Sequence, residues 1–196
     1  MTLRPLKVVA VCGSLQSPSK SLGLLDAIVD ELGARLEIET TVISLTDLAP
    51  TLAGSFSRNV VDPRLEEALQ EIESAELLVV VSPVYRAAFS GLFKHLFDLV
   101  NQRALEGTPV LLAATGGSER HSLILEHHLR PLFSFFQAVT LPLGVYGVES
   151  EFENYRVASP TLQERVERTV ERAIPLILHL HPEASKALPT AAAQQG

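Results

Sequence analysis

The sequence predicts a doubly wound α/β fold: five parallel strands in the order 2-1-3-4-5, with helices on both faces. Short apolar runs alternate with segments of helical period along most of the chain. The clearest run, residues 77–81, is entirely apolar, as expected of a strand buried on both faces. Loops rich in Gly, Ser, Thr and Pro follow the first, third and fourth strands, which are neighbours in this order. Ligands bind beyond the carboxyl ends of such strands, so these loops predict a binding site.

Each element is predicted by its own local pattern. Short apolar runs predict the strands, and apolar residues spaced three and four apart predict the helices. Ser19, Asp62 and Ser159 are favoured helix N-caps, and the last two precede a proline suited to a first helical turn. The segment 46–61 contains a proline and a glycine and is expected to be irregular. The expected elements are strands at residues 7–12, 37–45, 77–81, 109–114 and 139–145, and helices at 19–33, 63–74, 91–101, 121–136 and 160–178.

Length and composition limit the class of protein. The 196 residues suit one domain, expected at residues 1–181, followed by a tail at 182–196 that is expected to be disordered. The single cysteine, Cys12, excludes an internal disulfide and a cysteine-based zinc site, and the histidines form no recognised metal-binding motif. The net charge of -7 argues against nucleic-acid binding. No apolar run is long enough to cross a membrane and no signal segment begins the chain, so a cytoplasmic location is expected.

The loop after the first strand favours a phosphate ligand. Gly13 allows a tight exit from the strand, and four serines, at positions 14, 17, 19 and 21, lead into the helix. Unpaired amides and partial positive charge at a helix N-terminus favour an anion. The loop lacks the glycines of nucleotide-triphosphate and dinucleotide loops, and its hydroxyls instead fit the three oxygens of a phosphate monoester. The alternative is a serine-rich helix cap without a ligand.

Four motifs, taken together and in order, resemble the NADPH-dependent FMN reductase family of flavodoxin-like proteins. The resemblance extends over about residues 6–180, and it is nearest to the flavin reductases that serve alkanesulfonate or methanesulfonate monooxygenases. The motifs are Gly13-Ser14 with Pro18-Ser19-Lys20-Ser21, then Ser82-Pro83-Val84-Tyr85-Arg86, then residues 89–98, and finally Thr115-Gly116-Gly117.

The resemblance implies a set of flavin-binding residues and no catalytic acid, base or nucleophile, because the flavin itself carries the hydride chemistry. For each residue a plain structural role remains the alternative: a strand stop, a turn aromatic, or an ordinary strand-to-helix turn. Arg86 is left open between the FMN phosphate and the 2′-phosphate of NADPH. The implied assignment gives the phosphate to Ser14, Ser19, Lys20 and Ser21, one edge of the isoalloxazine to Pro83, Val84, Tyr85 and Arg86, and its other side to Thr115, Gly116 and Gly117.

The resemblance also implies the reaction. NADPH or NADH would reduce FMN, which is a substrate or a loosely held cofactor, and reduced FMN would pass to a two-component monooxygenase in sulfur assimilation. One alternative is a reductase of quinones, azo dyes or chromate that keeps its FMN. A less favoured alternative is a flavodoxin-like electron carrier, since this chain lacks the Trp that often stacks on flavin in such carriers.

A homodimer or homotetramer is expected, because adjacent Phe135 and Phe136 indicate more apolar surface than one domain needs to cover its sheet. The alkanesulfonate-type reductases carry an inserted tyrosine that forms a π-bulge in the helix after Thr-Gly-Gly. Here His127 stands at or near that position. The loop residue Arg58 is a candidate contact to a neighbouring subunit, and the simpler alternative is a solvated loop charge. Lys94 and Asp98 are expected to form a surface or interface ion pair.

Overall fold

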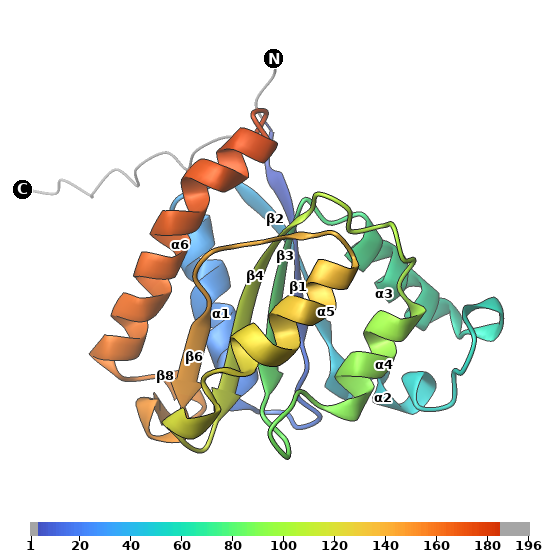
Figure 1. The fold of residues 1–196 in the computed structure, drawn as a ribbon, viewed down its shortest axis with the longest axis horizontal. Helices are drawn as coiled ribbons and strands as arrows, with labels where there is room; N and C mark the ends of the chain where they lie inside the picture. Colours follow the sequence, from blue (N-terminus) through green and yellow to red (C-terminus); the bar gives the residue numbers. More distant parts are fainter. Residues whose placement is uncertain (1–3, 185–196) are drawn as a thin grey trace, which may run out of the picture.

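The computed structural model describes residues 4–184, and its centre is a parallel sheet. Strands β2 (Ile38–Ser44), β1 (Leu6–Cys12), β3 (Leu77–Pro83), β4 (Pro109–Gly116) and β5 (Val139–Thr140) follow one another in that order, each parallel to its neighbour. The predicted fold class and the order 2-1-3-4-5 are therefore confirmed. The carboxyl ends of β1, β3 and β4 lie together at the lower edge of Figure 1.

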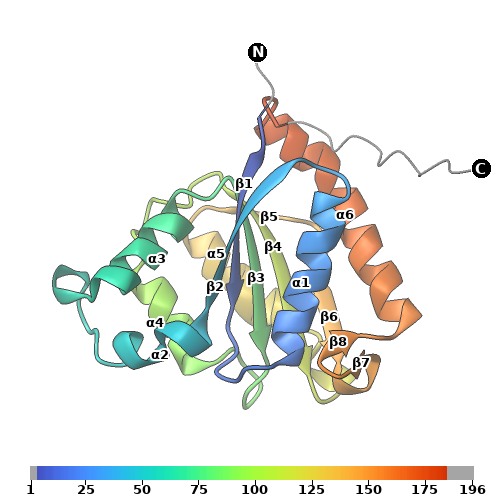
Figure 2. The ribbon, with the colours of Figure 1, turned by 180° about the vertical axis from the view of Figure 1, so that it is seen from behind.

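Helices cover both faces of the sheet. On one face lie α1 (Lys20–Gly33) and α6 (Pro160–Leu180), which are in front in Figure 2. On the other lie α2 (Leu45–Leu52), α3 (Pro63–Glu73), α4 (Gly91–Leu99) and α5 (Arg130–Phe135), as Figure 1 shows. None of the helices in the described part of the chain is long and apolar enough to cross a membrane.

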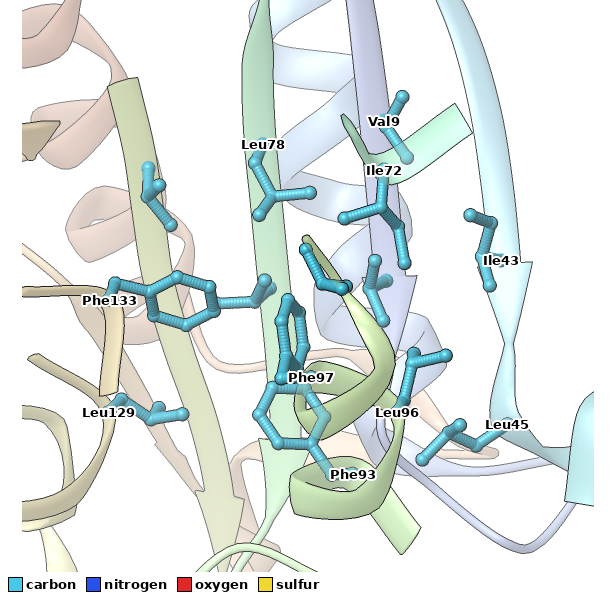
Figure 3. Packing of buried hydrophobic residues seen from close by; sticks show 14 of the residues in the cluster. Val9, Ile43, Leu45, Ile72, Leu78, Phe93, Leu96, Phe97, Leu129 and Phe133 are labelled. Carbon is cyan, nitrogen blue, oxygen red and sulfur yellow. The ribbon is translucent and has the colours of Figure 1, made fainter. Parts of the chain in front are cut away.

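Two apolar cores result from the alternation of side chains along the strands. In β1, Val9 and Val11 point into the core beneath α3 and α4, whereas Val8 and Ala10 point into the core beneath α1 and α6. The first core contains a cluster of aromatic rings, seen in Figure 3. There the ring centroids of Phe93 and Phe97 lie 4.9 Å apart, and Phe133 meets Phe97 edge-on at 5.0 Å. This packing fixes α4 against the sheet, directly beside the loops at its carboxyl edge.

The expectation of an irregular segment at residues 46–61 is wrong in its first half. Helix α2 begins after Ser44, whose hydroxyl accepts a hydrogen bond from the amide of Thr46 at 3.3 Å. Leu45, Leu48 and Leu52 are buried along one side, a helical spacing visible in the sequence. Pro50 lies within this short helix, and its presence had indicated a break. A 3₁₀ turn, η1 (Arg58–Val60), follows.

Arg58 does not extend away from the domain as a solvated loop charge. It pairs with two carboxylates of α3, those of Glu66, at 2.9 Å, and Glu73. The hydrogen bond from Arg58 to Glu66 holds the pKa of the Glu66 carboxyl below its usual value. The ion pair expected between Lys94 and Asp98 is present on α4.

The fifth strand is divided in two, which corrects the single strand expected at residues 139–145. After β5 the chain leaves the sheet at residues 141–144, and β6 (Val145–Val148) then pairs with β4 nearer its carboxyl end. Pro142 in this break has no amide to donate to a ladder. A Cβ at Gly144 would lie 2.7 Å from the carbonyl oxygen of Leu112, so the chain returns to β4 at a point where only glycine fits.

Beyond β6 the chain forms a hairpin that the sequence patterns had not indicated. A 3₁₀ turn, η4 (Glu149–Glu151), precedes the two short antiparallel strands β7 (Phe152–Glu153) and β8 (Arg156–Val157). Asn154 and Tyr155 connect them with positive φ angles of 47° and 65°. A strand of two residues is too short to show an alternation of apolar and polar side chains, so the sequence pattern did not predict these strands.

The helix expected at residues 121–136 is interrupted. It begins as the 3₁₀ turn η2 (Glu119–His121), continues as one π-helical turn, η3 (Leu125–Leu129), and becomes regular only in α5. His127 and His128 lie in this π turn and are both exposed. The ring of His128 meets Phe89 edge-on, with the centroids 6.2 Å apart. A π-helical turn is therefore present where the resemblance implied one, and it contains His127.

Both ends of the described chain meet at the edge of the sheet far from the loops. Arg4 forms an ion pair with Glu183 at 3.0 Å and another with Glu76, and the amide of Arg4 donates to the carbonyl of Glu183 at 3.1 Å. Residues 182–184 of the expected tail thus turn back onto the domain, and Ala184 is buried. The rest of that tail, residues 185–196, lies outside the described residues.

Candidate functional site

A cleft of about 210 Å³ lies at the carboxyl edge of β1, β3 and β4. This is the edge at which doubly wound sheets bind ligands. Three loops distant in sequence form most of its wall, and a fourth segment, after β6, completes it. The residues that line the cleft are Ser14, Gln16, Pro18, Ser19, Lys20, Ser21, Pro83, Val84, Tyr85, Thr115, Gly116, Gly117, Glu149 and Tyr155.

The first wall is the N-terminus of α1. Ser19 is the N-cap, and its hydroxyl accepts a hydrogen bond from the amide of Leu22 at 3.2 Å. The first amides of a helix have no partner within the helix. With Leu22 satisfied by the cap, the amides of Lys20 and Ser21 remain for a ligand in the cleft that these two residues line.

Two further serine hydroxyls of this loop are buried and engaged within the protein. Ser14 Oγ accepts a hydrogen bond from the amide of Gln16 and donates one to its carbonyl, both at 3.1 Å. Ser21 Oγ lies 2.7 Å from Thr115 Oγ1, in a buried bond between α1 and the end of β4. Ser14 and Ser21 are 3% and 2% exposed, so in this structure their hydroxyls shape the loop more than they face the cleft.

The turn after β3 forms the second wall. The amide of Val84 donates to the carbonyl of Thr115 at 2.8 Å, and Tyr85 and Ala88 exchange backbone hydrogen bonds across the turn. Arg86 occupies the tip with a φ of 51°, a left-handed conformation uncommon for a side chain of its size. It is exposed and is not among the residues that line the cleft, unlike the three residues before it.

The two glycines after β4 have different surroundings. A Cβ at Gly116 would collide with the hydroxyl of Tyr146, which donates to the carbonyl of Ser118 at 2.7 Å and so fixes this loop. Burial raises the pKa of that Tyr146 hydroxyl, which keeps its proton for this bond. A Cβ at Gly117 would meet no described atom within 4 Å. Gly116 is therefore required by packing, while Gly117 leaves open space where a ligand approaches.

The sequence patterns missed the fourth wall. Glu149 reaches across from η4 to form an ion pair with Lys20, and this contact lowers the pKa of the Glu149 carboxyl. Tyr155, at the tip of the β7–β8 hairpin, packs its backbone so closely on α1 that a Cβ at Gly23 would collide with its carbonyl oxygen. Gly23 within a helix was the available sequence signal, since a helical glycine suggests close approach of another segment.

The chemistry of the lining is that of a binding site. Its hydroxyls, amides and single ammonium group suit a phosphate, and the tyrosine side chains suit an aromatic ring. Among the described lining residues there is no histidine, cysteine or aspartate to act as nucleophile or base. Cys12 lies near the loop but is buried, and burial raises the pKa of its thiol.

Comparison with known proteins agrees with this geometry. The family model described as NADPH-dependent FMN reductase matches residues 6–153. The chain is 56% identical over 172 residues to the FMN reductase (NADPH) of Pseudomonas aeruginosa, with 88% of this chain and 92% of the relative covered. It is 53% identical to the NADH-dependent FMN reductase SfnF of Pseudomonas fluorescens, over 91% of this chain and 96% of the relative. A solved oxidoreductase from Corynebacterium diphtheriae is 32% identical, with a TM-score of 0.79 over 90% of this chain and 99% of that chain.

We expect Gly116→Ala to lower the free energy of unfolding by about 1–3 kcal/mol, because the added methyl group overpacks against the Tyr146 hydroxyl. Gly117→Ala is the matched control and should change it by less than about 0.5 kcal/mol. Urea unfolding measures both. Adding Tyr146→Phe to Gly116→Ala should recover part of the loss. Equal losses at the two glycines would contradict the packing role assigned to Gly116.

Proposed function

The chain belongs to the NADPH-dependent FMN reductase family, and from that membership we propose that it uses NADPH or NADH to reduce exchangeable FMN and passes reduced FMN to a separate monooxygenase of the sulfonate type, in sulfur assimilation. The observation that carries the proposal is the cleft beyond β1, β3 and β4. It combines a capped helix N-terminus and Lys20 with open glycine backbone and Tyr85.

The residues present fit the FMN phosphate. Ser19 supplies a hydroxyl, Lys20 an ammonium group, and the first turn of α1 two amides without helical partners. We assign Ser14 and Ser21 to the same phosphate site, where their buried hydrogen bonds hold the loop in shape. A site that is already formed loses little conformational entropy on binding.

The walls of the cleft after β3 and β4 fit a flat ring. We assign Pro83, Val84 and Tyr85 to one edge of the flavin and Thr115, Gly116 and Gly117 to its other side. Tyr85 is 41% exposed and presents an aromatic surface, and Gly117 leaves its amide accessible. FMN supplies the hydride chemistry when it is bound, and these residues bind and orient it. Arg86, outside the cleft on its exposed turn, is assigned to the phosphate of the incoming dinucleotide or of FMN.

We propose a homodimer or homotetramer that associates through α4 and α5. A groove of about 480 Å³ lies between these helices and is lined mainly by apolar side chains, among them Phe97, Leu132 and Phe136. Phe135 at its rim is 62% exposed, and Leu123, just before the π turn, is 59% exposed. Large exposed apolar side chains around a groove are typical of a surface that a partner covers.

Steady-state oxidation of NADPH by flavin-stripped protein tests the proposed reaction. We expect saturable turnover that depends on added FMN, with a higher KM for riboflavin. The same assay with NADH in place of NADPH gives the coenzyme preference. Turnover of quinones or dyes, appearing only after one equivalent of FMN has been restored and without any response to further FMN, would show that the flavin is a bound prosthetic group instead.

We expect Ser19→Ala to raise the KM for FMN about tenfold while leaving that for riboflavin unchanged, because a hydrogen bond to the charged phosphate is lost. Ser159→Ala is the matched control, since Ser159 caps α6 in the same way and lies outside the cleft lining. Each variant should lose about 1 kcal/mol of stability because each loses a helix cap. A difference between them in the KM for FMN therefore reports phosphate binding and not stability. A parallel rise in the KM for both flavins would argue against the assignment.

Sedimentation velocity tests the proposed association. We expect the protein to sediment as a dimer or tetramer and Phe135→Ser to shift it toward smaller species. Val42→Ser is the control, because Val42 is 49% exposed on the edge strand β2 and lies outside the groove between α4 and α5. Sedimentation of the unmodified protein as a monomer, or equal effects of the two substitutions, would contradict the assigned surface.

A further inference from the structure

The cleft contains one cation, and that cation is already paired. Among the described residues that line the cleft, only Lys20 and Glu149 are charged, and their side chains form an ion pair across 129 residues of sequence. The terminal phosphate of FMN carries between one and two negative charges near neutral pH. A phosphate that reaches the N-terminus of α1 therefore meets a lysine whose charge Glu149 already balances.

The carboxylate of Glu149 can move away from Lys20 without leaving a buried polar group unsatisfied. Its side chain is 66% exposed, against 31% for Lys20, and its carboxylate makes no other hydrogen bond among the described residues. An exposed ion pair of this kind is weak. The Glu149 carboxylate and a phosphate therefore bind Lys20 with similar affinity, so either anion can displace the other.

The backbone that carries Glu149 is fixed, so only the side chain has to move. Glu151, in the same turn, accepts a hydrogen bond from the amide of Val148 at 2.8 Å and pairs with Arg165 of α6 at 3.1 Å. The following hairpin packs on α1 at Gly23 through the carbonyl of Tyr155. The carboxylate is consequently presented to Lys20 by a segment anchored on both sides.

We propose that Glu149 is a specificity-determining residue that competes with the phosphate of FMN for Lys20 and so limits the affinity for phosphorylated flavin. This inference rests on the proposed function of the same cleft. The competition suits an enzyme that must release reduced FMN, because Glu149 neutralises Lys20 again as the phosphate leaves. Riboflavin has no phosphate and does not displace Glu149, so its affinity does not depend on this residue.

The test is the Kd of FMN and of riboflavin, measured by quenching of flavin fluorescence without nicotinamide coenzyme. Glu149→Gln should lower the Kd of FMN about fivefold and leave that of riboflavin unchanged. Glu153→Gln, which removes the same charge from an exposed position of the hairpin outside the cleft, should change neither. Unchanged or weaker FMN binding in Glu149→Gln, or an equal gain for riboflavin, would overturn the inference.

A double-variant cycle separates competition for Lys20 from direct repulsion of the phosphate. In a Lys20→Gln protein, the additional change Glu149→Gln should no longer tighten FMN binding. A gain that persists there would overturn the competition. Equal affinity of the unmodified protein for FMN and riboflavin would overturn the proposed phosphate site and this inference with it. A preference for FMN that Glu149→Gln leaves unchanged would overturn this inference alone.

Discussion

The parallel pairing of β1 with β3, and of β3 with β4, is the constraint on which the rest of this structure depends. Neighbouring parallel strands end at the same edge of a sheet. Here Cys12 lies opposite Val81, and Ser82 lies opposite Ala114. The amide of Gly13 continues the pattern with a 2.7 Å bond to the carbonyl of Val81. Three loops that are distant in sequence are thereby brought to one edge, where they form most of the cleft.

Hydrogen bonds between these loops then give the cleft its shape before any ligand arrives. Ser21 bonds to Thr115, and Ser90 Oγ donates to the carbonyl of Gly13 at 3.1 Å. Each bond satisfies a buried polar group, and buried polar groups without partners are costly. Beneath them Phe93 lies so close to Gly13 that a Cβ there would be 2.8 Å from its ring. The apolar core thus supports the loop that we assign to phosphate.

The cleft and the face assigned to self-association are linked through a single turn. Phe89 follows the second wall of the cleft, and its ring packs both on Phe93 of α4, at 5.5 Å, and on His128 of the π turn, at 6.2 Å. A subunit seated on α4 and α5 would therefore lie near the residues that we assign to the flavin.

Local pattern predicted the elements and the positions from which most of the cleft is built: an apolar run, a serine cap, a glycine turn. The alternation of these elements then predicted the fold class and the strand order, because few parallel arrangements accommodate it. The missed helix α2 was also present in the local pattern, in the spacing of its leucines, but Pro50 obscured it. Which groups face the cleft could be seen only in the folded chain. There the hydroxyls of Ser14 and Ser21 are buried, Gly116 packs against Tyr146, and Glu149 pairs with Lys20. Contacts between segments so distant in sequence have no local period, and they are set by how β6 and its hairpin return to the sheet.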